Sequence, residues 1–123
     1  LNPAIDIGQI EGGYVQGAGW LTTEELVWDD AGRLRTHAPS TYKIPVASDA
    51  PEVFNVALWD AQNREETIYR SKAVGEPPFM LGISAFLALS DAVAACGPQY
   101  PALNAPATAE EVWRAIGRAQ NGV

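Results

Sequence analysis

The sequence has very little cysteine or histidine, with one residue of each type among 123. Cys96 has no second cysteine with which to form an internal disulfide, which suits a reducing cytoplasm, and a single thiol cannot hold an iron–sulfur cluster. His37 lies in a polar stretch without clustered carboxylates, so we expect it at the surface and assign it no metal. No charged and then apolar leader opens the chain, and we therefore expect a cytoplasmic protein.

Positive charge is also scarce, because 8 lysines and arginines stand against 15 aspartates and glutamates, for a net charge of −7. Without a Lys/Arg cluster the surface does not suit a phosphate backbone, and we expect no nucleic-acid partner. The apolar run at residues 78–96 approaches the length of a membrane span, but Asp91, two serines and the prolines at its start argue against a membrane. The 47% hydrophobic content suits one globular domain or part of one. Because Leu1 enters a motif at once with no initiator methionine, we expect a piece of a longer polypeptide.

Residues 8–23 are rich in glycine yet keep the apolar spacing of a helix. Each glycine opposes an isolated helix by roughly 1 kcal/mol relative to alanine, so a tertiary contact must compensate. Small residues recur four positions apart, at Gly8 and Gly12 and again at Gly13 and Gly17. Such a face accommodates either the backbone of another helix or a flat cofactor, and the spacing does not choose between them. The stretch lacks the third glycine of a dinucleotide fingerprint.

The middle of the chain carries several short stretches that predict strands. These are residues 24–29, a return strand from Leu34 after a turn at residues 30–32, then residues 53–59 and 67–69. Residues 39–45, bounded by two prolines, predict an ordered loop whose hydroxyl groups either bind phosphate or close local turns. We therefore expect an α+β fold with a few antiparallel strands and two or three helices.

Two further helices are expected in the second half of the chain. Residues 78–96 are apolar on nearly every face, which is typical of a buried helix, and Gly97 followed by Pro98 should end it. Thr108 and Glu111 form a capping-box pattern that opens a final amphipathic helix. We interpret that last helix as structural.

The string SKAVGEPP at residues 71–78 places one carboxylate between a glycine and a double proline. Each proline disfavours the α region for the residue before it, so Glu76 and Pro77 should be extended and the helix should begin near Pro78. The helix start favours an ionised carboxylate, and the prolines have no N–H to donate to it. Gly75 permits close approach of a ligand or of backbone. On these grounds Glu76 is either a general base or a carboxylate that only marks the helix entry.

Three motifs follow one another along the chain: NPAIDIGQIEG at residues 2–12, PSTYKIP at 39–45, and SKAVGEPP at 71–78. Together they resemble the C-terminal part of the molybdenum-binding subunit of the xanthine dehydrogenase/oxidase family, over residues 1 to about 95. The resemblance implies that residues 1–123 are the C-terminal segment of a molybdenum cofactor-binding domain and not an autonomous domain. It also implies a role for four residues: Glu76 as general base, Gln9 and Gly75 in cofactor binding, and Val74 in the wall of the substrate cavity. No metal ligand is implied.

The activity implied by the resemblance is oxidation of hypoxanthine and xanthine to urate with oxygen from water. Glu76 would remove the proton of a molybdenum-bound hydroxyl, and electrons would pass through 2Fe–2S clusters and FAD to NAD. Only molybdenum-molybdopterin would be bound in this subunit, whereas FAD and the clusters would belong to other domains or subunits of a hetero-oligomer. Two alternatives stay open: an aldehyde oxidase-type molybdenum hydroxylase, and a non-catalytic scaffold or subunit-packing domain.

Overall fold

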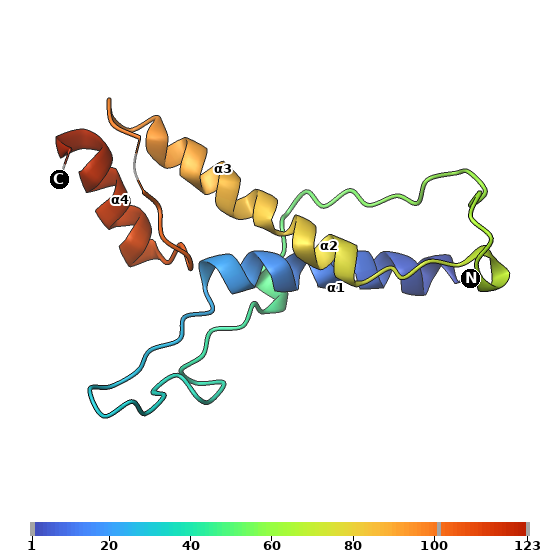
Figure 1. Cartoon of the computed structure of the whole chain (residues 1–123), viewed down its shortest axis with the longest axis horizontal. Coiled ribbons are helices and arrows are strands. Elements are labelled where there is room, and N and C mark those ends of the chain that lie inside the picture. Colours follow the sequence, from blue (N-terminus) through green and yellow to red (C-terminus); the bar gives the residue numbers. More distant parts are fainter. Residues whose placement is uncertain (1, 101, 123) are drawn as a thin grey trace.

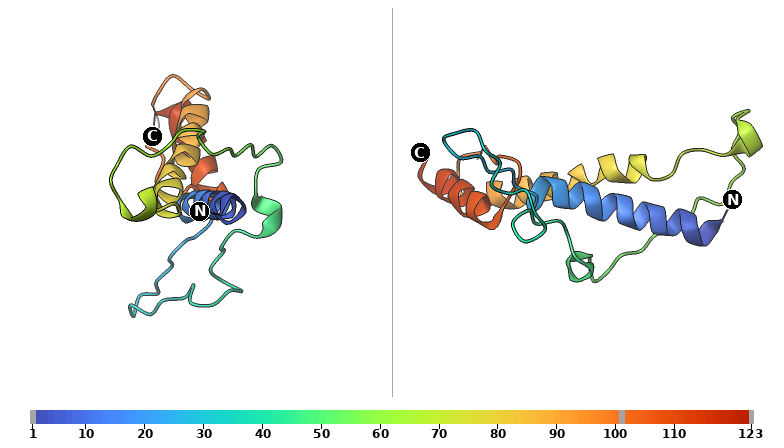
Figure 2. Two further views of the ribbon diagram at one scale, coloured as in Figure 1. Left: turned by 90° about the vertical axis from the view of Figure 1, so that its right-hand side faces the viewer. Right: turned by 90° about the horizontal axis from the view of Figure 1, so that it is seen from below.

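The computed structural model describes residues 2–100 and 102–122. Along this part of the chain the elements are α1 (Pro3–Thr22), the 3₁₀ turns η1 (Ala47–Asp49) and η2 (Ile68–Arg70), α2 (Glu76–Leu81), α3 (Ile83–Ala94) and α4 (Ala109–Asn121). α2 lies along α1, α3 continues from α2 and diverges from α1, and α4 packs beside α3 (Figure 1). The long connections between α1 and η1 and between η1 and α2 extend away from the helices (Figure 2).

The α+β prediction is wrong, because no strand forms among the residues that the structure describes. In the described chain, backbone pairing between residues 24–29 and the return segment is limited to one antiparallel bridge, between Trp28 and Leu34. The turn between them lies where it was predicted: Gly32 has φ 75°, and the Asp29 carboxylate accepts two backbone hydrogen bonds of the turn. Alternation marks which side chains would face a core, but a strand needs a hydrogen-bonded partner along its length, and this hairpin lacks one.

The other two predicted strands are also absent. Residues 53–59 have no regular pairing along their length. Residues 67–69 lead into η2, where Tyr69 has φ 51° and therefore cannot continue a strand. Both segments have the β-rich composition of a strand but no neighbouring strand to bond with, which is why composition alone predicted them wrongly.

The prediction of a glycine-rich helix is confirmed, and α1 starts earlier than the spacing indicated. The Asn2 side chain caps it by accepting a hydrogen bond from the Ile5 N–H at 3.3 Å. Pro3 follows as the first helical residue, where its missing N–H costs no hydrogen bond.

Glycines compensate for their low helix propensity by letting α1 and α2 touch backbone to backbone. A Cβ atom on Gly13 would lie 2.5 Å from the Gly75 carbonyl oxygen, and one on Gly17 would overlap the Phe79 carbonyl group. From the other side, a Cβ atom on Gly82 would lie 2.7 Å from backbone atoms of α1. Real Cβ atoms do not approach so closely, so this contact requires glycine both on α1 and at Gly82, which joins α2 to α3.

α2 begins at Glu76, two residues before the predicted start at Pro78. The prediction that Glu76 and Pro77 are extended is therefore wrong. Gly75 adopts helical angles (φ −81°, ψ −42°), and its carbonyl accepts a hydrogen bond from the Phe79 N–H at 3.3 Å, which closes the first turn. Prolines are tolerated there because the first N–H groups of a helix have no partner inside it. The predicted place of Glu76 at a helix entry is confirmed.

The prediction of a buried helix over residues 78–96 is wrong for this chain. Only 17% of the most apolar stretch of Glu76–Ala94 is buried, and Met80, Leu81 and Leu87 are 51%, 68% and 60% exposed. By length and composition alone this run would also suit a membrane span, and the expectation of no membrane partner stays a prediction. Periodicity shows that a surface is apolar but does not show what covers it.

Half of the predicted capping box forms at the start of α4, where the Thr108 hydroxyl accepts a hydrogen bond from the Glu111 N–H at 3.3 Å. The reciprocal bond is not made, because the Thr108 N–H donates to the Pro106 carbonyl instead. The Glu111 carboxylate accepts hydrogen bonds from the Asn104 N–H at 3.0 Å and from Arg118 at 2.5 Å. The Asn104 N–H and then the Arg118 guanidinium hold the pKa of Glu111 below its ordinary value, against the opposing effect of burial. This network fastens α4 to the connector that precedes it.

The predicted role of Gly97 as the end of a helix is wrong. α3 already ends at Ala94, and the following Ala95 keeps right-handed helical angles. A Cβ atom on Gly97 would instead overlap the Ala119 carbonyl group of α4. Glycine is therefore needed at this position because α4 approaches so closely.

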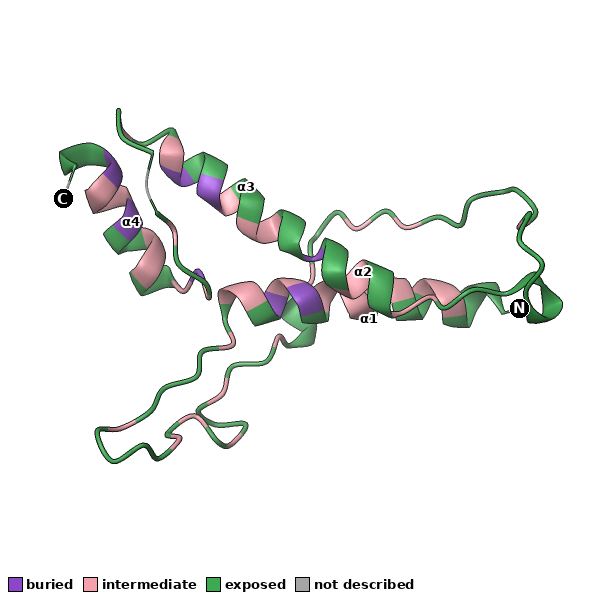
Figure 3. Ribbon diagram, viewed as in Figure 1, coloured by how far each residue is buried: buried purple, intermediate pink, exposed green. Residues whose placement is uncertain are grey.

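The arrangement of helices leaves an unusually large surface exposed (Figure 3). The accessible area is 9293 Å², whereas a compact monomer of 13.2 kDa exposes about 6,400 Å². Among the described residues the buried apolar side chains are Val93, Ala107, Ala115 and Ala119. Three alanines and one valine make too small a core to stabilise a domain of this length.

We predict that the isolated 123-residue chain is aggregated or poorly folded, because its apolar helices lack covering partners. Size-exclusion chromatography and calorimetry of the purified chain test this. A soluble monomer with a sharp, cooperative melting transition would show the prediction to be wrong.

We predict opposite effects for alanine at two glycines of α1. Gly17→Ala places a Cβ atom on the Phe79 carbonyl group and should destabilise by about 1–3 kcal/mol, as overpacking does. Gly12→Ala meets no atom within 4 Å and should be neutral or stabilise by up to about 1 kcal/mol. Thermal unfolding of the intact, ligand-free polypeptide compares them, and equal melting temperatures would contradict this packing.

Candidate functional site

An open groove of 860 Å³ lies between α1 and the entry to α2. Its lining residues are Gly8, Gln9, Gly12, Gly13, Gln16, Ala73, Gly75, Glu76 and Phe79. The groove exists because α2 covers α1 only from about Gly13 onward, so the earlier turns of α1 carry no helix above them (Figure 1). It therefore lies where the chain enters α2.

The small-residue face of α1 divides into two parts at this point. Gly13 and Gly17 touch α2, as described above. Gly8 and Gly12 would each offer an added Cβ atom open space, with no atom within 4 Å. Each interpretation of the spacing thus applies to one pair of glycines. Gly13 and Gly17 serve helix packing, whereas Gly8 and Gly12 leave room beside the groove.

Gln9 lies on the same face and meets the entry to α2. Its side-chain oxygen would lie 3.3 Å from a Cβ atom on Gly75, so the glycine leaves room for the Gln9 amide. Gln9 is exposed and makes no hydrogen bond with another residue in the described part of the chain. An amide can donate and accept at once, and here both capacities are unused.

Glu76 follows as the first residue of α2 and lines the same groove. Its side chain is exposed, and its carboxylate has neither a hydrogen bond nor an ion pair with any residue that the structure describes. The next two residues are prolines, which have no N–H to offer it. The structure thus brings together Gln9, Gly75 and an unpartnered carboxylate.

Val74, the fourth predicted site residue, is half-buried and is not among the residues that line this groove. Its neighbour Ala73 lines the groove instead. The sequence analysis also missed Gln16 and Phe79. The spacing held a signal for both, because Gln16 lies two helical turns after Gln9 and Phe79 lies nearly one turn after Glu76.

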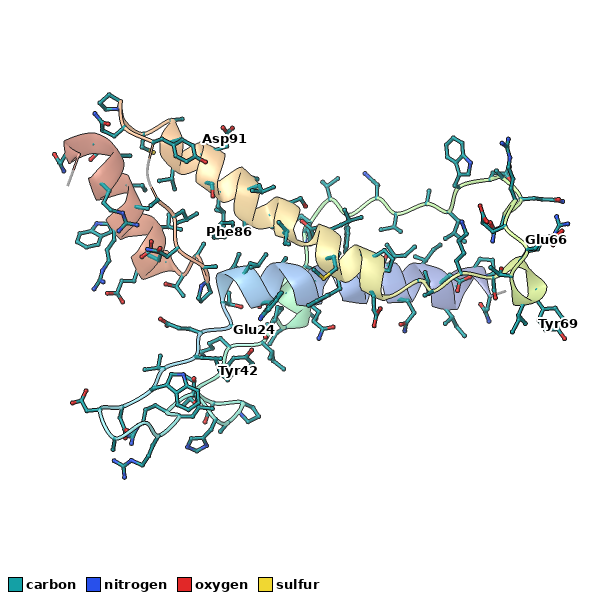
Figure 4. The ribbon with its side chains drawn as sticks, in the orientation of Figure 1. Glu24, Tyr42, Glu66, Tyr69, Phe86 and Asp91 are labelled. Carbon is teal, nitrogen blue, oxygen red and sulfur yellow. The ribbon has the colours of Figure 1, made fainter. Side chains whose placement is uncertain are left out.

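Other chemically reactive side chains gather at no second site. His37 and Cys96 are both exposed, and in residues 2–100 and 102–122 no group of three potential metal ligands forms. The Tyr42 hydroxyl donates a hydrogen bond to Glu24 at 2.6 Å, which raises the pKa of Tyr42 (Figure 4). This pair holds the loop at residues 39–45 against the end of α1.

The prediction of a loop at residues 39–45 is confirmed by its turn structure. Thr41 closes one turn by donating a hydrogen bond to the Ala38 carbonyl at 3.1 Å. A second bond joins the loop to the helix, because the Thr23 hydroxyl donates to the Lys43 carbonyl at 2.8 Å. Of the two uses weighed for these hydroxyl groups, local turn closure is the one seen at Thr41.

Comparison with protein families matches residues 1–51 to the model described as "Molybdopterin cofactor-binding domain". The matched part contains the open face of α1, with Gln9 and Gln16, and ends before Glu76. Among solved structures, quinoline 2-oxidoreductase from Pseudomonas putida 86 superposes with a TM-score of 0.79 at 29% identity. That match covers 96% of this chain and 15% of the other.

Two curated relatives match over most of the chain. The xanthine dehydrogenase/oxidase of Felis catus is 48% identical over 120 residues, which cover 91% of this chain and 9% of the relative. Aldehyde oxidase 2 of Mus musculus is 52% identical over 99 residues, which cover 80% of this chain and 7% of the relative. The chain therefore spans less than a tenth of the length of these relatives. With the cofactor-binding model and these identities in agreement, the chain belongs to the xanthine dehydrogenase/oxidase family of molybdopterin-binding proteins.

Proposed function

We propose that this chain forms part of the catalytic subunit of a molybdenum hydroxylase that oxidises hypoxanthine and xanthine to urate. The observation that carries the proposal is the unpartnered Glu76 carboxylate, which shares one groove with the free amide of Gln9. A carboxylate that no neighbour occupies suits a general base. The names of the relatives, xanthine dehydrogenase/oxidase among them, support the choice of substrate.

The residues of the groove fit a molybdopterin cofactor. Gly8 and Gly12 leave open space that a side chain would fill, which suits a flat ring system. The amide of Gln9 offers a donor and an acceptor to its polar edge without adding charge. Gln9 and Gly75 are the residues we propose to hold the group near Glu76.

When bound, the molybdenum cofactor supplies activation of water and a two-electron acceptor. Glu76 accepts the proton from the water-derived oxygen as that oxygen attacks the purine carbon, a contribution typically worth 10²–10⁴-fold in rate. Glu76 is the first residue of α2, and the two prolines that follow it fix the backbone on its C-terminal side. Phe79 supplies an apolar wall one turn further on.

The remaining components of the reaction lie outside this chain in our proposal. We place the 2Fe–2S clusters and FAD on other domains or subunits, with NAD as electron acceptor, in a cytoplasmic hetero-oligomer. One exposed cysteine cannot hold a cluster. Most of the length of each relative lies outside the part that this chain matches, and it offers room for those sites.

An aldehyde substrate is the second candidate, and the 52% identity with an aldehyde oxidase favours it. None of the described residues that line the groove is cationic, so purine recognition by charge would come from elsewhere in the subunit. Turnover of hypoxanthine against an aldehyde separates the two enzymes. Molybdenum analysis of the full-length protein separates both from a non-catalytic scaffold, which would contain no metal.

We predict that Gln9→Ala in the intact enzyme lowers activity more than stability. Gln9 is exposed and has no partner in the described chain, so its removal should cost little folding energy. Steady-state turnover, molybdenum content and melting temperature are measured together. Unchanged turnover with unchanged molybdenum would make Gln9 a packing residue.

We predict that Glu76→Gln slows reduction of the metal centre by xanthine at least about 10²-fold, because the amide cannot accept the proton. The protein should still fold and load its cofactor, since the side chain keeps its shape. Rapid mixing of fully loaded enzyme measures the rate. The control is Glu52→Gln, which removes the same charge from an exposed position outside the groove and should leave the rate unchanged. Slowing below about tenfold would leave Glu76 as a helix-entry carboxylate.

A further inference from the structure

Gln16 lines the groove but has no role in the proposed reaction. We infer that Gln16 is a second amide contact for the molybdopterin cofactor and holds the part of it that lies away from Gln9. This inference rests on the proposed function and extends it to a residue that the sequence analysis did not single out.

The placement of Gln16 follows from how α1 and α2 run. The two helices lie side by side in the same direction, because Gly13 faces Gly75 and Gly17 faces Phe79. The Gln9 end of the groove is therefore the end at Gly75, where α2 begins. Gln16 lies two turns further along α1, about 10 Å away, toward Phe79.

The Phe79 end of the groove is an aromatic, apolar surface. The Phe79 ring stacks on Trp20 of α1, with ring centroids 5.6 Å apart and an interplanar angle of 25°. Gln16 therefore lines the groove beside Phe79, whose ring packs on Trp20. A ligand there meets an apolar face and a free amide together.

The size of the ligand favours the cofactor over the substrate. Gln9 and Gln16 lie about 10 Å apart along α1, and the three fused rings of a pyranopterin span that separation more readily than the two rings of a purine. The pterin edge carries an N–H donor next to a carbonyl acceptor, and a glutamine amide is complementary to that pair. Gln16 is exposed and makes no hydrogen bond with a described residue, so both of its capacities are free.

The test uses Gln16→Met in the intact, cofactor-loaded enzyme, because methionine keeps the length and helix propensity of glutamine but removes the hydrogen bonds. Release of pterin and molybdenum in mild denaturant is followed over time, by fluorescence of the oxidised pterin and by metal analysis. We expect release about three- to tenfold faster than in the wild type, the range that one net hydrogen bond provides. Gln62→Ala, an exposed glutamine of the loop between η1 and η2, is the control and should not change release.

Three results would overturn the inference. Release at the wild-type rate would show that Gln16 does not hold the cofactor. If Gln16→Met lowered the melting temperature of the cofactor-free protein as much as that of the loaded protein, Gln16 would serve folding instead. Unchanged release with a raised KM for xanthine would assign it to the substrate. None of these three results contradicts the proposed function, provided that the wild type contains molybdenum and the Glu76→Gln enzyme is slow. A wild-type enzyme without pterin would contradict both the inference and the proposed function.

Discussion

The structure depends on one contact, in which the backbones of α1 and α2 meet without side chains between them. Gly13 and Gly17 on α1 and Gly82 after α2 leave no space there for a Cβ atom. Glycines oppose a helix by roughly 1 kcal/mol each, so α1 is stabilised by this contact rather than by its own propensity. Dispersion between closely packed backbone atoms is the compensating interaction.

The position of the site follows from the same contact. α2 has to begin where it can lie on Gly13, and its first residue is Glu76. N-terminal to that level, the small-residue face of α1 continues through Gly12 and Gly8, where no described atom lies within 4 Å of an added Cβ atom. One run of small residues thus packs two helices and then leaves an open groove beside the carboxylate.

The apolar surface of α2 and α3 is exposed in a chain that corresponds to only a small part of its relatives. Met80, Leu81 and Leu87 face solvent here, while the chain covers 9% of the feline relative. An apolar helix is stable in water only when another surface covers it. We therefore expect the groove to keep its shape best when another protein surface covers these helices.

Local signals in the sequence determined the features that neighbouring residues control by themselves. The turn at residues 30–32, the turn that Thr41 closes, the Thr108 cap and the place of Glu76 at a helix entry all depend on hydrogen bonds within a few residues. Three motifs in a fixed order also carried the family resemblance. Such features are legible because the interacting groups lie close together in the chain.

Only the tertiary structure decided how the elements meet. The strands failed because ladder partners are supplied by distant chain, and residues 24–29 found only the single bridge between Trp28 and Leu34. The four-residue spacing of small residues is identical for Gly8 with Gly12 and for Gly13 with Gly17. The position of α2 along α1 decides which pair is covered and which stays open. That position is a tertiary contact, and the spacing of residues along the chain does not specify it.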